Sequence, residues 1–212
     1  MQTTKLQTIY LNKVSEALSR LSACESHLKL YKTSNDIYLF ESAVLQMRKA
    51  LESVAFASIA PNKEEYAKLR AKSEDSPDYT KDFNAKKILQ LLSNVNPDFY
   101  PKPISAPIPN GPNAWHFEQR VDNSLTRKKF ESFYDRLGKF LHADNPWGNN
   151  KNYENLLNDL PKIIIAVRLL LSYHYTVIRT PNFNGVWVVN APSDGTTPTI
   201  FGAQATGDFV AM

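Results

Sequence analysis

The sequence predicts a mainly α-helical protein, an antiparallel helical bundle followed by a small C-terminal β appendage. Apolar residues recur every three or four positions along most of the first 179 residues, which is the period of an amphipathic helix. After residue 180 the pattern changes to β-branched and aromatic runs. We therefore divide the chain into a helical bundle domain, residues 1–180, which includes a Pro-rich loop at 95–114, and a short β-hairpin-like tail, residues 181–212.

Two long helices are predicted first, over about residues 5–32 and from residue 36 to about residue 60. The first has one apolar stripe, made of Leu11, Val14, Leu18, Leu21 and Leu28. The second has another, made of Ile37, Phe40, Val44, Met47, Leu51 and Val54. Any residue of Ser34-Asn35-Asp36 can cap the second helix, and Pro61 marks its end. The short polar turn predicts an antiparallel hairpin, with Arg48 and Glu52 as a surface ion pair worth a few tenths of a kcal/mol.

The middle of the chain predicts two shorter helices, near residues 63–72 and 82–94, and then the Pro-rich loop. Six of the 13 prolines lie in residues 95–114, a density that excludes helix and favours extended geometry. The loop is either a ligand of the PxxP type or an ordered segment laid over the helices. In the second case we expect four residues to anchor it, Tyr100, Ile104, Ile108 and Trp115.

Two more long helices and the tail complete the predicted fold. One helix begins near residues 122–124 and runs to about residue 143. The last spans about residues 151–179, and Pro161 should kink or restart it. In the tail, residues 186–189 and 199–201 read as strands, and residues 209–210 read as a third.

Composition and charge indicate the compartment and the classes of ligand. The single cysteine, Cys24, fits a reducing compartment, and the scattered histidines show no metal-ligand spacing, so we expect no metal and no cofactor. No signal peptide and no membrane-spanning run is visible, so we expect a cytoplasmic protein that does not associate with a membrane. Residues 1–179 contain 25 basic and 19 acidic side chains, a net charge of +6, which suits either nucleic-acid binding or an ordinary solvated surface.

One constellation could perform chemistry. Phosphate loops, nucleophile elbows and zinc motifs are missing from the sequence. Arg136 and His142 remain, separated by five residues at the end of a predicted helix. Six positions correspond to about 600° of rotation, which places the two side chains roughly 120° apart around the axis.

Here the chain resembles the HEPN family, whose active members have an Arg and a His separated by four to six residues near the end of one helix. The resemblance covers about residues 5–179 and implies an HEPN-like bundle. It also implies metal-independent RNA cleavage, in which the ribose 2′-hydroxyl attacks the adjacent phosphate and leaves a cyclic phosphate. Active members usually have a polar residue directly after the Arg, whereas this chain has Leu137.

The resemblance also assigns roles. His142 would be the acid/base and Arg136 the clamp on the phosphorane charge. Lys139 would add to the phosphate field, and Asp144 or Asn145 would orient the imidazole. Family members usually form homodimers that bring two motifs into one cleft, which would reconcile the 120° separation. The implied setting is a toxin–antitoxin or antiviral defence effector, with RNA as the substrate and an antitoxin or other protein as the partner.

Structural interpretations of the same residues stay open. A charged His142 at a helix C-terminus would be stabilised by the helix dipole, and Arg136 would pair with Asp135 or Glu131 on the surface. A noncatalytic helical protein-interaction or dimerisation module is the alternative function, favoured by the tail, the Pro-rich loop and Leu137. A nucleotide-binding module is a third. We expect His174 to be half-buried in the last helix and Trp147 to lie in a core or an interface.

Overall fold

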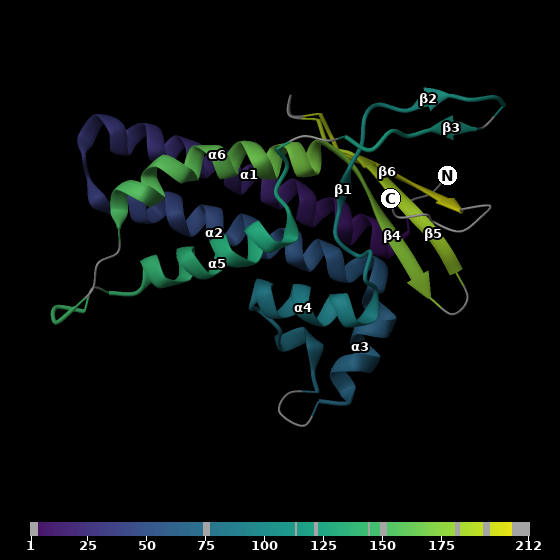
Figure 1. Cartoon of the computed structure of the whole chain (residues 1–212), viewed down its shortest axis with the longest axis horizontal. Helices are drawn as coiled ribbons and strands as arrows, with labels where there is room; N and C mark the ends of the chain where they lie inside the picture. The colour runs from purple at the N-terminus through teal and green to yellow at the C-terminus, as the bar shows by residue number, and fades with distance from the viewer. Residues whose placement is uncertain are drawn as a thin grey trace.

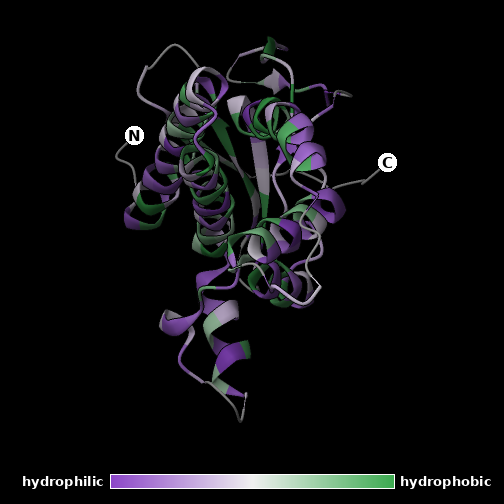
Figure 2. Cartoon of the chain, turned by 90° about the vertical axis from the view of Figure 1, so that its left-hand side faces the viewer, coloured by the Kyte–Doolittle hydropathy of each residue, from purple (hydrophilic) through white to green (hydrophobic). Residues whose placement is uncertain are grey.

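The protein is mainly helical, with a small antiparallel sheet at one end of the long helices (Figure 1). The computed structural model describes residues 4–73, 77–112, 114–120, 123–143, 145–148, 152–180, 183–192 and 196–204. Helix α1 packs on α2 and α6, and α2 also packs on α4 and α5. Hydrophobic and hydrophilic residues alternate along the helices (Figure 2), as the periodicity predicts. In the described part of the chain, no helix combines the length and the apolar composition needed to cross a bilayer.

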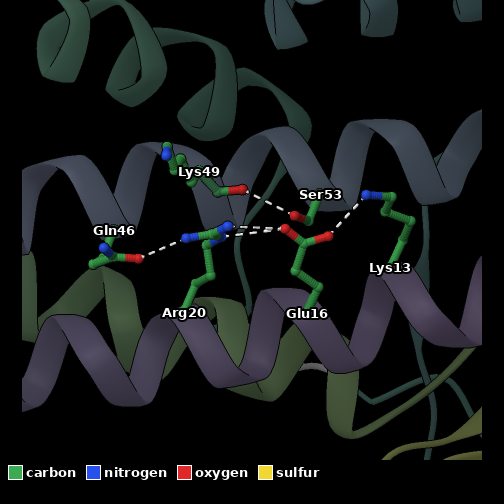
Figure 3. Close-up of polar contacts among 6 residues, drawn as sticks. All are labelled: Lys13, Glu16, Arg20, Gln46, Lys49 and Ser53. Carbon is green, nitrogen blue, oxygen red and sulfur yellow. Dashed lines mark hydrogen bonds and ion pairs between the residues drawn. The ribbon is translucent and has the colours of Figure 1, made fainter.

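Helices α1 (Lys5–Ser34) and α2 (Ile37–Ile59) form the predicted hairpin. Thr4 and Gln7 cap the start of α1 reciprocally, and Asn35 ends it in the left-handed region with φ 55°. The Asp36 side chain then accepts a hydrogen bond from the backbone N of Tyr38 and starts α2. Arg20 of α1 joins the two helices by donating to Glu16 on its own helix and to Gln46 on α2 (Figure 3).

Four short helical segments follow. The 3-10 turn η1 (Ala60–Asn62) contains Pro61 and leads into α3 (Lys63–Ala71). After η2 (Tyr79–Lys81), α4 (Ala85–Val95) packs on α2 and α5. The buried Arg70 guanidinium pairs with Asp82 at 2.9 Å, and Tyr66 donates to the same carboxylate at 2.8 Å. This pairing holds α3 against the segment that enters α4.

The Pro-rich loop is extended, as predicted. It forms β1 (Lys102–Pro103) and a small hairpin of β2 (Ile108–Pro109) and β3 (Trp115–His116). The Tyr100 hydroxyl donates to the Leu125 carbonyl at 2.7 Å and Ile104 is buried, so these two residues anchor the loop as expected. Ile108 and Trp115 are about half exposed, and the prediction that they anchor the loop is wrong.

The last two helices end earlier than the sequence suggests. Helix α5 spans Arg127–Leu141 with Thr126 as its N-cap. Helix α6 spans Tyr153–Ser172 and continues through Pro161 without interruption. The prediction that it extends to residue 179 is wrong, because Tyr173–Thr180 is strand β4. At the end of α6, where the chain changes from helix to strand, the Arg120 side chain donates to the Leu169 carbonyl and to the Ser172 hydroxyl.

Strand β4 lies inside a four-stranded antiparallel sheet in the order β1-β4-β5-β6. Strand β5 (Phe183–Asn190) pairs with β4 along its whole length, from Tyr173 opposite Asn190 to Thr180 opposite Phe183. Strand β6 (Thr199–Gln204) pairs with β5. The tail strands at 186–189 and 199–201 are therefore confirmed, whereas residues 209–210 lie outside the described residues. The sheet takes strands from both sides of residue 180.

The sheet packs on the N-terminal part of α1 through a second hydrophobic cluster. Tyr10 and Val14 of α1 are buried there with Ile178 of β4 and with Trp187 and Val189 of β5. The rings of Tyr10 and Trp187 meet edge to face, with centroids 5.9 Å apart. Trp187 is thus a packing residue of this cluster, and the β segment is part of the same folded body as the helices.

His174 is fully buried in β4, so the prediction of a half-buried residue in the last helix is wrong. Its Nδ1 lies 3.0 Å from the Leu171 carbonyl, which only accepts, so Nδ1 holds the hydrogen. Its Nε2 therefore accepts a hydrogen bond from the Tyr10 hydroxyl at 2.7 Å. Both ring nitrogens of the neutral imidazole are satisfied, and burial lowers the pKa of His174 to about 4.

We predict that this histidine makes the fold sensitive to mild acid. Its pKa is lower in the folded chain than in the unfolded one, so its contribution is complete above about pH 6.5 and is lost as the pH falls towards 4. Between pH 7 and pH 4.5 the free energy of unfolding should fall by about 2 to 3 kcal/mol from this group. Urea titrations of the wild type and of His174→Gln measure the difference. Equal pH dependence in both proteins would contradict the prediction, and exposed His116→Gln serves as the control.

Candidate active site

Arg136 lies on α5, on the side of the helix that faces α6. An apolar stripe next to Arg136 buries the adjoining face of α5, and it comprises Phe130, Phe133, Tyr134, Leu137 and Phe140. Arg136 Nη1 donates to Asp159 Oδ2 of α6 at 2.6 Å, and both side chains are about two fifths exposed. The predicted pairing with Asp135 or Glu131 is wrong, because Asp135 pairs with Lys86 and Glu131 with Arg127.

Arg136 has one buried nitrogen that is not hydrogen-bonded. Its Nη2 is inaccessible to solvent and has no partner among the described residues. Buried donors are nearly always paired, since an unmet one costs about 1 to 3 kcal/mol. The Asp159 carboxylate and the Phe133 ring, whose centroid lies 5.9 Å from Cζ, hold the guanidinium in place. Nη1 of this guanidinium is thus hydrogen-bonded within the protein, whereas Nη2 is not bonded to any described residue.

The guanidinium faces a cleft of about 830 Å³ between α5 and α6, which we call the α5–α6 cleft. Residues 123–125 close one end, where the backbone N of Leu125 donates to the Ala166 carbonyl at 3.1 Å. Apolar side chains line its walls, among them Phe133, Ile163 and Ile165. Of the described residues that line it, Lys128, Lys129, Arg136 and Lys162 are cations and Asp159 is a carboxylate.

His142 stands at the C-terminal end of α5, one position beyond the last helical residue. Its backbone leaves the helix with φ −75° and ψ 152°, and its side chain is exposed. It is not among the residues that line the α5–α6 cleft. The sequence motif therefore places Arg136 and His142 on one helix but on different sides of it, as the rotation of about 120° requires.

The three supporting residues have different surroundings. Lys139 is exposed in the last turn of α5. Asn145 accepts a hydrogen bond from the backbone N of Trp147 at 3.0 Å, which closes the turn after the helix. Asp144 lies outside the described residues. Trp147 is 90% exposed, so the expectation that it packs in a core is wrong for the single chain.

Sequence reasoning missed the partner of Arg136 and the neighbouring lysines. Asp159 and Lys162 lie 23 and 26 positions beyond the arginine, and only the packing of α6 brings them to it. A signal did exist on α5, because Lys128, Ser132 and Arg136 recur at steps of four and share one face. Among the described residues, no group of three or more His, Cys, Asp or Glu side chains is placed to hold a metal ion.

A second polar cluster fixes the position of α5 on α2. Arg48 Nη2 donates to the Tyr134 hydroxyl at 2.7 Å, and that hydroxyl donates to Glu52 at 2.9 Å. The Arg48 guanidinium also stacks over the Tyr134 ring at 4.1 Å. A Cβ at Gly138 would lie 2.5 Å from Arg48 Nη1, so the glycine makes room for the guanidinium. The predicted ion pair between Arg48 and Glu52 exists within α2 at 3.2 Å, and both of its members also bond to the Tyr134 hydroxyl of α5.

Comparison with known proteins adds no relative, because no family model, no curated protein and no solved structure significantly matches the chain. The residues and their geometry are therefore the basis for an assignment.

We predict that Tyr134→Phe lowers the free energy of unfolding by about 1 to 2 kcal/mol, because it removes two hydrogen bonds to charged groups from a partly buried cluster. Burial and the hydrogen bond to Glu52 raise the pKa of Tyr134 to about 12, so the hydroxyl stays protonated across the usual range of pH. Denaturant titration measures the change. The control is Tyr38→Phe, at a side chain that is 73% exposed, and a loss as large in the control as in Tyr134→Phe would refute the prediction.

Proposed function

We propose that this chain is a metal-independent endoribonuclease of the HEPN type, with an HEPN-like helical bundle as its scaffold. The main observation in support is that Arg136 lines a cleft together with three lysines and keeps one buried nitrogen without a partner among the described residues. A guanidinium with a free N–H beside other cations is suited to a phosphate that gains charge in the transition state. The exposed His142 on the same helix is the matching group for proton transfer.

In the proposed reaction, the ribose 2′-oxygen attacks the adjacent phosphorus and the bond to the 5′-oxygen breaks. The proton of the 2′-hydroxyl passes to a base, and an acid supplies a proton to the leaving oxygen. The products are a 2′,3′-cyclic phosphate and a 5′-hydroxyl. His142 moves the protons, and Arg136 stabilises the charge on the phosphorane. Lys139 adds positive charge, and Asn145 or Asp144 supports the histidine.

The separation of the two residues around α5 favours a site shared by two copies of the chain. Within one chain, His142 does not line the cleft that Arg136 faces. In a homodimer, Arg136 of one copy and the partner's histidine would meet at one phosphate. Exposed Trp147, five positions after the histidine, is available for such a contact or for a base. An enzyme of this kind would act in the cytoplasm as a toxin or antiviral defence effector under the control of a partner protein.

Leu137 has a structural explanation. It is fully buried in the apolar stripe of α5, so packing against α2 and α4 requires an apolar residue at that position. This packing explains why residue 137 is apolar here, whereas active HEPN members usually have a polar residue at that position. The adjacent Arg136 still faces the cleft.

The competing proposal is a noncatalytic interaction module. It is favoured by the β2–β3 hairpin, where Ile108 and Trp115 are each about half exposed. A module of this kind would bind its partner without cutting RNA, so one assay separates the two functions.

We predict that the purified protein cleaves total RNA or tRNA in excess EDTA and leaves cyclic-phosphate ends. Arg136→Ala and His142→Ala should each lower the rate by about 100-fold or more, the usual effect of removing a charge-stabilising or proton-transferring group. Matched controls are His116→Ala and Arg168→Ala, since Arg168 makes a similar interhelical pair with Glu25 at 2.8 Å. A parent protein that does not cut, or a histidine variant that cuts as fast as the parent, would refute the nuclease.

We further predict that mixing inactive Arg136→Ala and His142→Ala chains restores part of the activity. A mixed dimer retains one complete site if each site takes its arginine from one copy and its histidine from the other. Cleavage is measured after the two variants are unfolded and refolded together, with each refolded alone as the control. No recovery, when sedimentation shows that mixed dimers have formed, would exclude a shared site of this kind.

A further inference from the structure

We propose that the α5–α6 cleft binds the sugar–phosphate backbone of single-stranded RNA outside the reaction centre, through Lys128, Lys129 and Lys162. This proposal rests on the proposed function for the identity of the strand as RNA. Binding itself does not require cleavage, so it is tested separately.

The charge of the cleft supports an anionic ligand. Among the described residues, its lining has four cations and one carboxylate, a net charge of +3. Asp159 is already shared by Arg136 at 2.6 Å and Lys162 at 3.8 Å. Lys128 and Lys129 are exposed and make no ion pair with a described residue. Two of the lysines are therefore uncompensated, and a ligand with one negative charge on every repeating unit would meet all of them.

The walls of the cleft suit the remaining parts of a nucleotide. Phe133, Ile163 and Ile165 form an apolar surface, and Ile165 is 58% exposed although it is a large aliphatic side chain. Ser132 and Asn123 add polar groups that can bond to sugar hydroxyls. A volume of about 830 Å³ matches clefts that enclose small molecules. A slot between two helices admits one strand with its bases turned to the walls, whereas a duplex would present only its outer phosphates.

The order of the cations along α5 gives the strand a path. Lys128 and Lys129 lie in the first turn, and Arg136 follows about 12 Å further along the axis at 1.5 Å per residue. Lys128 and Lys129 would therefore hold the strand about 10 Å away from the arginine, beyond the scissile phosphate. Lys162 lies nearer to Arg136, because the two cations share the Asp159 carboxylate, and it would hold the strand next to the reaction centre. Their role is to position the strand, and no sequence preference follows from phosphate contacts.

An acidic peptide would also be drawn to these cations, but the cleft offers it little else. Both walls are helices, so an extended peptide finds no strand edge to pair with. A strand of RNA needs no such edge because its charges lie on its own backbone.

The experiment measures binding of a short fluorescent RNA whose riboses are 2′-O-methylated, so that no nucleophile is present and no cleavage occurs. Fluorescence anisotropy is recorded over a range of salt concentrations for the wild type and for Lys128→Gln/Lys129→Gln/Lys162→Gln. The control is Lys63→Gln/Lys72→Gln/Lys87→Gln, which removes three exposed lysines from α3, its end and α4. Thermal unfolding checks that both triple variants remain folded.

We expect the cleft variant to bind at least tenfold more weakly at low salt. The slope of log K against log salt concentration should fall by about 2, since each lost contact with a single strand contributes about 0.7. The control should keep the slope of the wild type. Equal slopes in the two triple variants, or no binding by the wild type, would overturn the proposal.

Competition assigns the ligand. Displacement of the RNA by polyglutamate at equal charge concentration would overturn the proposal in favour of an acidic protein partner. Tighter binding of single-stranded DNA would overturn the assignment to RNA. If the wild type binds through these lysines but never cuts unmodified RNA, the binding site is supported and the nuclease is refuted. If the wild type cuts RNA but the three lysine substitutions change neither binding nor its salt dependence, the nuclease is supported and the binding site is refuted.

Discussion

The burial of helix α2 is the constraint on which the rest of the structure depends. Eleven of its 23 residues are buried, and Ser53, Val54 and Ala55 are buried in succession, so its C-terminal half is covered around more than one face. Burial of apolar surface stabilises by about 25 cal/mol per Å², and a helix that is apolar on several sides gains this only when several elements pack on it. Helices α1, α4 and α5 provide that cover, and each is thereby fixed relative to the others.

This packing determines what α5 presents to the rest of the molecule. Its apolar stripe is held against α2 by the Tyr134 cluster with Arg48 and by the edge-to-face contact of Phe140 with Phe40 at 5.2 Å. The cationic side of the same helix must then face α6. Nη2 of Arg136 has no partner among the described residues because, in this orientation, α6 supplies one described carboxylate for several cations. The scaffold and the candidate site are thus two sides of one amphipathic helix.

The elements with strong local signals were predicted well. The α1–α2 hairpin has two regular apolar stripes and clear capping residues, and both helices form within a few residues of the predicted bounds. The end of α6 was not predicted, because residues 173–179 continue an apolar run that fits a helix and a strand equally. Pairing of β4 with β5 and the bond of His174 to Tyr10 decide in favour of the strand. The bond of His174 to Tyr10 joins residues that are distant in the sequence, whereas β4 and β5 are neighbouring segments that form a hairpin.

The sequence by itself determined the helical class, the hairpin, the extended Pro-rich loop and the position of Arg136 and His142 on one helix. These follow from local periodicity, from capping chemistry and from the fixed rotation of about 100° per residue. Only the tertiary structure decided that Asp159 and Lys162 join Arg136, that β1 and β4 belong to the sheet, and that His174 is buried and neutral. The reason is physical: ion pairs, strand pairing and desolvation depend on which surfaces meet, and those surfaces come from segments far apart in the chain.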